Sequence, residues 1–257
     1  MVETDLVRAF RKRDRARVTT VLDDLLDRPY GNLVVVGGAA IRYWLLVKTG
    51  ERLKRPFNDL DFMASYPGDL DPRLTESFLV HHFHLDGPDT DFRFVFVHKA
   101  TGTKIDVFHW KPEYPDVASV PFTSKRRRNN LLSMQGLSGQ FAVTVFDLET
   151  MRRRGPVDPK QLVDAELMRP YVNLREANRV WRQLFNDRPP LTVINAFKAA
   201  QERAAAQPAS FGEKPWQSQD TKYKCAKCVS SADWPIAPMK QIKKLLGYIE
   251  IDGANVY

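Results

Sequence analysis

The sequence has few of the features that mark secreted or membrane proteins. Only two of its 257 residues are cysteine, which is too few for a disulfide framework and agrees with a reducing compartment. The longest apolar stretch, Leu33 to Ile41, contains two glycines and is far too short to span a bilayer. The first residues, Met1 to Asp5, lack the basic and then apolar profile of a secretory signal. We therefore expect a cytoplasmic protein that has no membrane partner.

The sequence also lacks internal repeats and low-complexity tracts. Its content of 43% hydrophobic and 27% charged residues is that of an ordinary globular protein. At this length the chain can bury a substantial core, as one large domain or two small ones.

Positive charge is concentrated in two segments of the chain, which carries a net charge of +8. Val120 to Arg154 has seven basic and two acidic residues, and Glu213 to Lys244 has seven lysines and three acids. Two basic segments on a nearly neutral body suggest a polyanionic partner such as nucleic acid. The alternative is that they are solvated faces that keep the protein soluble, because clustering along a sequence need not mean clustering in space. Both interpretations stay open.

Hydrophobic periodicity divides the chain into an α/β half and a mostly helical half. The first half is predicted to contain a helix over 5–27, a strand over 33–38, a helix over 39–48, a strand over 58–64, a short helix near 73–80, a hairpin of strands over 92–98 and 104–110, and a strand over 141–146. The second half is predicted to contain helices over 148–154, 159–167, 174–185, 191–206 and 239–246, a loop or linker near 207–220, and a short strand over 248–251. The predicted fold class is α/β (α+β), a small mixed β-sheet flanked by helices. We expect a catalytic domain over residues 1–146 and a helical domain over 147–257.

Three carboxylates on predicted strands are the strongest chemical signal. The two-residue period of a strand puts Asp59 and Asp61 on one face, and the intervening Leu60 faces the core. Two carboxylates so close repel each other unless a cation lies between them, and Mg²⁺ is the usual hard, oxygen-seeking partner. Asp106, between the apolar Ile105 and Val107 on another strand, is expected to point to the same side.

Upstream of these acids, Gly37 and Gly38 end a strand and open a helix. Glycines let the backbone approach an anion closely, and the N–H groups and dipole of a helix N-terminus favour a phosphate. Each feature alone has a simpler interpretation, as a tight turn or an ordinary strand-edge acid. Their order along the chain indicates a site that holds a triphosphate and clamps two metal ions across it.

This order of motifs resembles the polymerase-β-type nucleotidyltransferase superfamily. Within it, the segments most similar to the AbiEii/MenT-type toxins are Val36-Gly-Gly-Ala-Ala-Ile-Arg, Arg55-Pro-Phe-Asn-Asp-Leu-Asp-Phe, Phe146-Asp-Leu-Glu-Thr-Met-Arg and the tract from Lys160 to Asp164. The resemblance covers about residues 30 to 170 and implies a nucleotidyltransferase fold.

The resemblance also implies roles for individual residues. Gly37, Gly38 and Arg152 would bind the nucleotide. Asp59, Asp61 and Asp106 would be catalytic and would hold two Mg²⁺ ions, with Mn²⁺ as an alternative. An NTP would be the co-substrate, a tRNA 3′ end the acceptor, and an antitoxin protein a partner.

Two alternatives to a tRNA-modifying enzyme stay open. One is the same chemistry on a small molecule, as in the antibiotic-modifying adenylyltransferases. The other is a nucleic-acid-binding module that has the nucleotidyltransferase fold but no turnover. Ala39 is consistent with this alternative, because the family often has Ser or Thr at that position.

Two weaker signals concern the basic run and the cysteines. Lys125, Arg126, Arg127 and Arg128 are expected to contact RNA phosphates. Cys225 and Cys228 have the spacing of half a zinc site, but no second Cys/His pair lies nearby, so ordinary thiols are expected.

Overall fold

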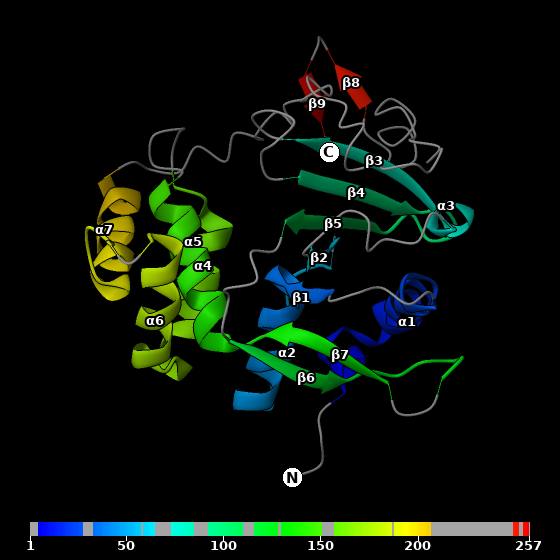
Figure 1. The fold of residues 1–257 in the computed structure, drawn as a ribbon, viewed down its shortest axis with the longest axis horizontal. Coiled ribbons are helices and arrows are strands. Elements are labelled where there is room, and N and C mark those ends of the chain that lie inside the picture. The colour runs from blue at the N-terminus through cyan, green and yellow to red at the C-terminus, as the bar shows by residue number, and fades with distance from the viewer. Residues whose placement is uncertain are drawn as a thin grey trace.

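A seven-stranded mixed sheet forms the centre of the protein in the computed structural model (Figure 1). The structure describes residues 5–27, 33–57, 59–64, 73–84, 92–109, 116–127, 130–150, 157–186, 188–206, 249–251 and 254–256. Within these residues the strand order is β3-β4-β5-β2-β1-β7-β6, and only the β1–β7 and β2–β5 pairs are parallel. The strands are β1 (Val34–Val36), β2 (Asp59–Ala64), β3 (Phe78–His84), β4 (Phe92–His98), β5 (Lys104–His109), β6 (Val117–Pro121) and β7 (Leu131–Gln135).

Helices flank the sheet, as the predicted α/β class requires. In order they are η1 (Leu6–Ala9), α1 (Lys12–Leu26), α2 (Gly37–Thr49), α3 (Leu74–Ser77), α4 (Leu137–Thr150), α5 (Pro159–Met168), η4 (Arg169–Tyr171), α6 (Leu174–Leu184) and α7 (Val193–Ala206). A separate two-stranded sheet pairs β8 (Ile249–Ile251) with β9 (Ala254–Val256). Figure 1 shows α4 to α7 gathered at one side of the molecule and α1 at the other. No described helix has the length and apolar character needed to cross a membrane.

Within the described residues, two large apolar cores support these layers. One face of the sheet packs against η1, α1 and α2, and a row of fully buried residues crosses it from strand to strand. That row consists of Met134, Val35, Phe62, Val107 and Phe94. The second core joins α4 to α7 and includes Ile41 and Leu45 from α2. Helix α2 therefore contributes to both cores and fixes the sheet relative to the helical layer.

The strand predicted over 141–146 is wrong. These residues lie in the middle of α4, where Phe141, Val145 and Leu148 are buried at helical spacing in the second core. The segment is apolar except for Thr144, and periodicity alone does not separate a buried helix from a buried strand in such a run. The helix predicted over 148–154 continues α4 as far as Thr150, and its remainder lies outside the described residues. The domain boundary expected between 146 and 147 falls inside α4, and the division into two domains stays a prediction.

Other predictions are confirmed or need smaller corrections. The hairpin of β4 and β5 is confirmed and turns at Gly102, where φ is +64°. The helices at α5, α6 and α7 and the strand at β8 are also confirmed. The helix predicted over 5–27 is broken at Phe10, whose backbone is extended. The helix predicted near 73–80 ends at Ser77 and continues as β3, and strands β6 and β7 were not predicted. The segments 207–220 and 239–246, with Cys225 and Cys228, lie outside the described residues.

Candidate metal centre

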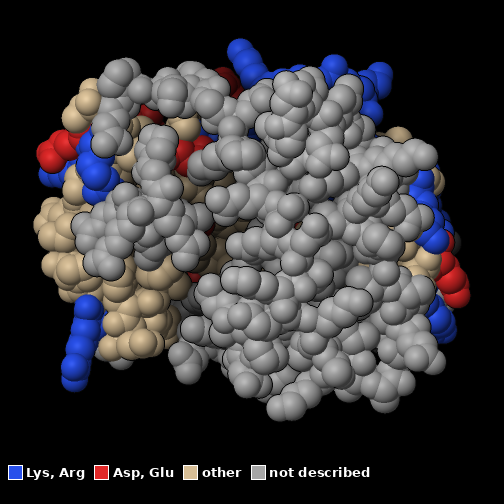
Figure 2. All heavy atoms as spheres, turned by 90° about the horizontal axis from the view of Figure 1, so that it is seen from above, with Lys and Arg blue, Asp and Glu red and all other residues tan. Residues whose placement is uncertain are grey.

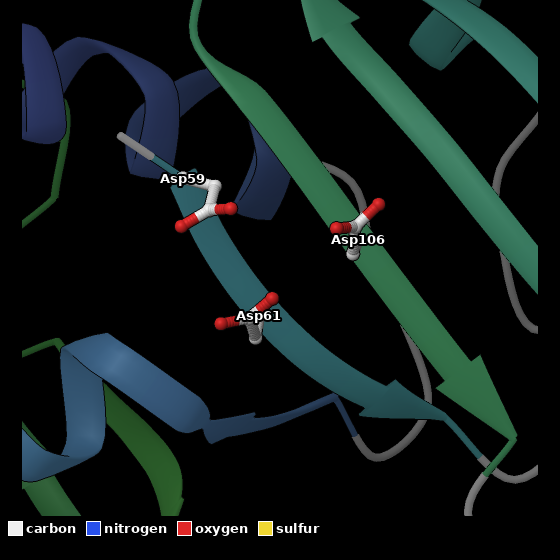
Figure 3. A group of neighbouring side chains, drawn as sticks. All are labelled: Asp59, Asp61 and Asp106. Atoms are coloured by element: carbon white, nitrogen blue, oxygen red, sulfur yellow. The ribbon is translucent and has the colours of Figure 1, made fainter. Parts of the chain in front are cut away.

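Three aspartates converge on one face of the sheet. Asp59 and Asp61 lie on β2, and Asp106 lies on the adjacent parallel strand β5, directly opposite Asp61 in the strand register. Three carboxylate oxygens, one from each residue, lie within 4.8 Å of one another. Figure 3 shows the side chains projecting from the same face of the two strands. The predicted convergence of the three carboxylates is confirmed.

Strand parity explains why these side chains point away from the first core. Leu60 on β2, and Ile105 and Val107 on β5, are fully buried on the opposite face. Because successive residues of a strand alternate between faces, burial of these three leaves the aspartates on the other face. A one-residue slip in either strand would put carboxylates into the apolar core, so the hydrophobic pattern fixes the register.

Burial and the neighbouring carboxylates raise the proton affinity of Asp61. The pKa of Asp61 is raised to about 7, first because the surrounding protein removes it from solvent and then because Asp59 and Asp106 repel its negative charge. The positive charges of Lys104 and Lys160 act in the opposite direction. A cation held between the three aspartates would therefore relieve an electrostatic cost that the fold carries.

A glycine turn lies directly against Asp61. Strand β1 ends at Val36, which pairs with Asp61, and α2 begins at Gly37 with φ +60°. A Cβ on Gly37 would lie only 2.9 Å from Asp61 Cγ. The Gly37 N–H donates a hydrogen bond of 2.9 Å to Gln140 Oε1 on α4. The predicted order of strand, glycine pair and helix is confirmed, and it brings the start of α2 to the carboxylates.

A buried arginine on α2 fixes the segment that leads into β2. Arg42 is only 3% exposed, and its guanidinium donates to the carbonyl oxygens of Leu53 at 3.1 Å, Arg55 at 2.9 Å and Pro56 at 2.6 Å. Burial, with the nearby Arg55, lowers the pKa of Arg42 to about 10. Arg42 thus ties the chain just before Asp59 to α2.

Helix α5 reaches the same region. Asp164 on α5 forms an ion pair with Arg55, whose guanidinium also lies 3.4 Å from the position of a Cβ on Gly38. Lys160 lies four residues before Asp164, one helical turn away on the same side of α5. Its charge is close enough to lower the pKa of Asp61.

Sequence reasoning missed Lys104, Arg55 and Lys160 as residues of the site. Lys104 could have been found from strand parity, because it stands two residues before Asp106. The i, i+4 spacing of Lys160 and Asp164 was a weaker signal.

The basic run is at a distance from the carboxylates. Lys125, Arg126 and Arg127 lie in the turn of the β6–β7 hairpin, whereas the other end of β7 leads into Gly136 at the start of α4. The five residues of β7 span about 17 Å at the usual strand rise. Arg128 and Arg152 lie outside the described residues.

Two arginines of this run form ion pairs with Asp24 on α1 and with Asp27, which directly follows α1. Arg126 lies 2.6 Å from Asp24 and 3.6 Å from Asp27, and Arg127 lies 3.8 Å from Asp27. About half of each arginine side chain remains exposed. On the face shown in Figure 2, the visible Lys and Arg side chains form several separate groups, some with Asp or Glu beside them.

Comparison with known proteins finds solved structures of similar fold. No protein-family model matches the chain, and no curated protein matches it. A solution structure of the antibiotic-resistance factor ANT(2'')-Ia is similar over 75% of this chain and 99% of that chain, with 14% sequence identity and a TM-score of 0.43. At this identity and TM-score the likeness assigns no function, so the function has to be inferred from the side chains of the site.

Proposed function

We propose that this protein is a metal-dependent nucleotidyltransferase, which moves a nucleoside monophosphate from an NTP to a hydroxyl acceptor and releases pyrophosphate. The observation that carries the proposal is the convergence of Asp59, Asp61 and Asp106 beside the glycine turn at Gly37. Neither feature alone specifies this chemistry, but a triphosphate substrate needs both an acidic metal centre and a close backbone approach.

The residues present fit divalent metal ions. Three carboxylates supply the hard oxygen ligands that Mg²⁺ prefers, and Mn²⁺ accepts the same ligands. We propose that Asp59, Asp61 and Asp106 hold two such ions together with oxygens of the NTP. Bound there, the ions would activate the attacking hydroxyl and neutralise charge on the phosphates.

The protein's own residues would orient the nucleotide. The N-terminal end of α2 favours an anion, and the missing side chain at Gly38 lets phosphate oxygens approach. Arg55, whose guanidinium lies near Gly38, and Lys160 on α5, whose charge acts on Asp61, add positive charge to this region. Arg152 is proposed as a further nucleotide-binding residue on the resemblance alone.

For the acceptor, we propose the 3′ end of a tRNA, in a toxin-like role with an antitoxin as partner. The net charge of +8 and the resemblance to the AbiEii/MenT-type toxins support a polyanionic acceptor. Lys125, Arg126, Arg127 and Arg128 are proposed to contact its phosphates at a distance from the reactive end.

A small-molecule acceptor is the second candidate function. The observation that favours it is the pairing of Arg126 and Arg127 with Asp24 and Asp27, which neutralises part of the basic run. A cationic antibiotic, unlike RNA, would need no basic surface.

A transfer assay tests the proposal. Each of the four α-³²P-labelled NTPs is incubated with Mg²⁺ and total tRNA, or with cationic antibiotics, using wild type, Asp61→Asn and Glu202→Gln. Glu202 is an exposed residue of α7 and controls for the loss of one carboxylate. We expect label in tRNA with wild type and Glu202→Gln, and none with Asp61→Asn. Label only in an antibiotic would support the second candidate, and no label in either would indicate a module without turnover.

A further inference from the structure

A lysine ammonium is built into the acidic cluster. Lys104 pairs with Asp59 in the register of β5 and β2, and it stands two residues before Asp106 on the same face of β5. Its Nζ lies 2.7 Å from Asp106 Oδ2, and the two side chains are 15% and 4% exposed. An enclosed ion pair of this kind carries a large desolvation cost. Stability of the fold is therefore not a sufficient reason for the pair.

We infer that Lys104 is an internal cation that competes with a metal ion for Asp106. The inference rests on the proposed function, because it needs a metal ion at the aspartates. A metal–oxygen bond of about 2.1 Å on Asp106 Oδ2 would put the ion less than about 5 Å from the ammonium. Two positive charges so close repel strongly in a partly enclosed site. Metal binding to Asp106 Oδ2 therefore requires the Lys104 ammonium to move away.

The chemistry of lysine suits this exchange. Its ammonium is a compact charge on a flexible four-carbon stem, so it can leave the carboxylate without moving the strand. While it is in place, Lys104 offsets repulsion among Asp59, Asp61 and Asp106. The metal-free protein thus keeps a partly neutralised cluster, and its metal affinity is lower than three aspartates alone would give.

The test is a Mn²⁺ titration of the protein without nucleotide, followed by the electron paramagnetic resonance signal of free Mn²⁺. We expect Lys104→Met to lower the dissociation constant by roughly tenfold or more, because the competing charge is gone. Lys104→Arg keeps the charge and should stay close to wild type. Lys48→Met, at an exposed lysine of α2, controls for net charge and should not change the affinity.

Thermal unfolding gives a second measurement that stays informative if Lys104→Met is unstable. In EDTA this variant should unfold at a lower temperature than wild type, because the aspartates have lost their counter-charge. Addition of Mg²⁺ should raise its unfolding temperature by more than it raises that of wild type. Two results would overturn the role of Lys104. One is an equal rise in unfolding temperature with Mg²⁺ for Lys104→Met and wild type, and the other is a Mn²⁺ affinity of Lys104→Met equal to or weaker than that of wild type.

The failures of the two hypotheses are distinguishable. If wild type and Lys104→Met bind Mn²⁺ equally and wild type transfers nucleotide, only the inference on Lys104 is wrong. If neither protein binds Mn²⁺, the inference is wrong and the proposed metal-dependent function is wrong with it.

Discussion

Gly37 and Asp61 are packed so closely that no side chain fits at position 37. A Cβ there would lie 2.9 Å from Asp61 Cγ, and the backbone of Gly37 has φ +60°, which L-residues rarely adopt. The residue that starts α2 and Asp61, whose carboxylate has a strongly raised pKa, therefore form one structural unit. The glycine turn has a role at the acidic cluster whether or not it binds phosphate.

This packing predicts that Gly37→Ala is damaging and Gly38→Ala is not. The first substitution combines a strained φ with an overlap at Asp61, and we expect a loss of about 2–4 kcal/mol in the free energy of unfolding. At Gly38 the nearest atom to an added Cβ is the flexible end of Arg55, at 3.4 Å, and alanine is the better helix former. Gly38→Ala should therefore be neutral or slightly stabilising. Urea unfolding of both variants measures the difference, and equal costs would contradict this packing.

Asp61→Asn is expected to stabilise the metal-free protein at neutral and higher pH. The folded-state pKa of Asp61 is about 7, above its ordinary value of 3.8. Between these values the folded protein binds more protons than the unfolded chain, so wild-type stability falls as pH rises from 4 to 7. Asp61→Asn lacks this pH dependence. Its free energy of unfolding at pH 8 should exceed that of wild type by on the order of 2 kcal/mol.

The pH profile of that difference is the check. In EDTA, the free energies of unfolding of wild type and Asp61→Asn should show no difference due to this group below pH 4. Above pH 7 the difference should be constant. A gap that narrows as pH rises would contradict the raised pKa.

Arg42 is expected to be the main support of the segment before β2. Arg42→Lys keeps the charge but cannot reach all three carbonyl oxygens, and we expect a loss of about 2–3 kcal/mol in the free energy of unfolding. Arg179→Lys is the matched control, because Arg179 is half-exposed and, among the described residues, its only ion pair is with Glu176 on the same helix. Thermal unfolding should separate the two variants, and equal stability would mean that the Arg42 hydrogen bonds contribute little.

The basic run gives a prediction that separates the two acceptor classes. If the acceptor is RNA, replacing Arg126 and Arg127 with alanine should lower the slope of log affinity against log salt by roughly 0.7 to 0.9 for each lost phosphate contact. Binding of free NTP should hardly change, because the run lies at the far end of the β6–β7 hairpin. Salt titrations of tRNA binding measure this slope. Parallel slopes for wild type and the double variant would favour the small-molecule acceptor.

Local patterns in the sequence predicted the acidic cluster well. Alternation along β2 and β5 put Asp59, Asp61 and Asp106 on one face, and the order of strand, glycines and helix placed Gly37 near them. Such patterns depend on neighbours within a few residues, which the sequence displays directly.

The supports of the site depend on tertiary contacts that the sequence does not display. Arg42 reaches carbonyl oxygens 11 to 14 residues away, and Arg55 meets Asp164 across 109 residues. The buried segment around Phe141 has no period to distinguish helix from strand. Strand β6 ends in Pro121, which weakens its strand signal.

The central claim is that Asp59, Asp61 and Asp106 hold metal ions at a nucleotide. The most direct measurement is a crystal structure with Mn²⁺ and a non-hydrolysable NTP, in which anomalous scattering locates the metal. We predict two Mn²⁺ peaks roughly 3.5–4 Å apart, in contact with oxygens of all three aspartates and with phosphate oxygens near Gly38. Nucleotide or Mn²⁺ bound elsewhere, with the three aspartates free of metal, would contradict the account.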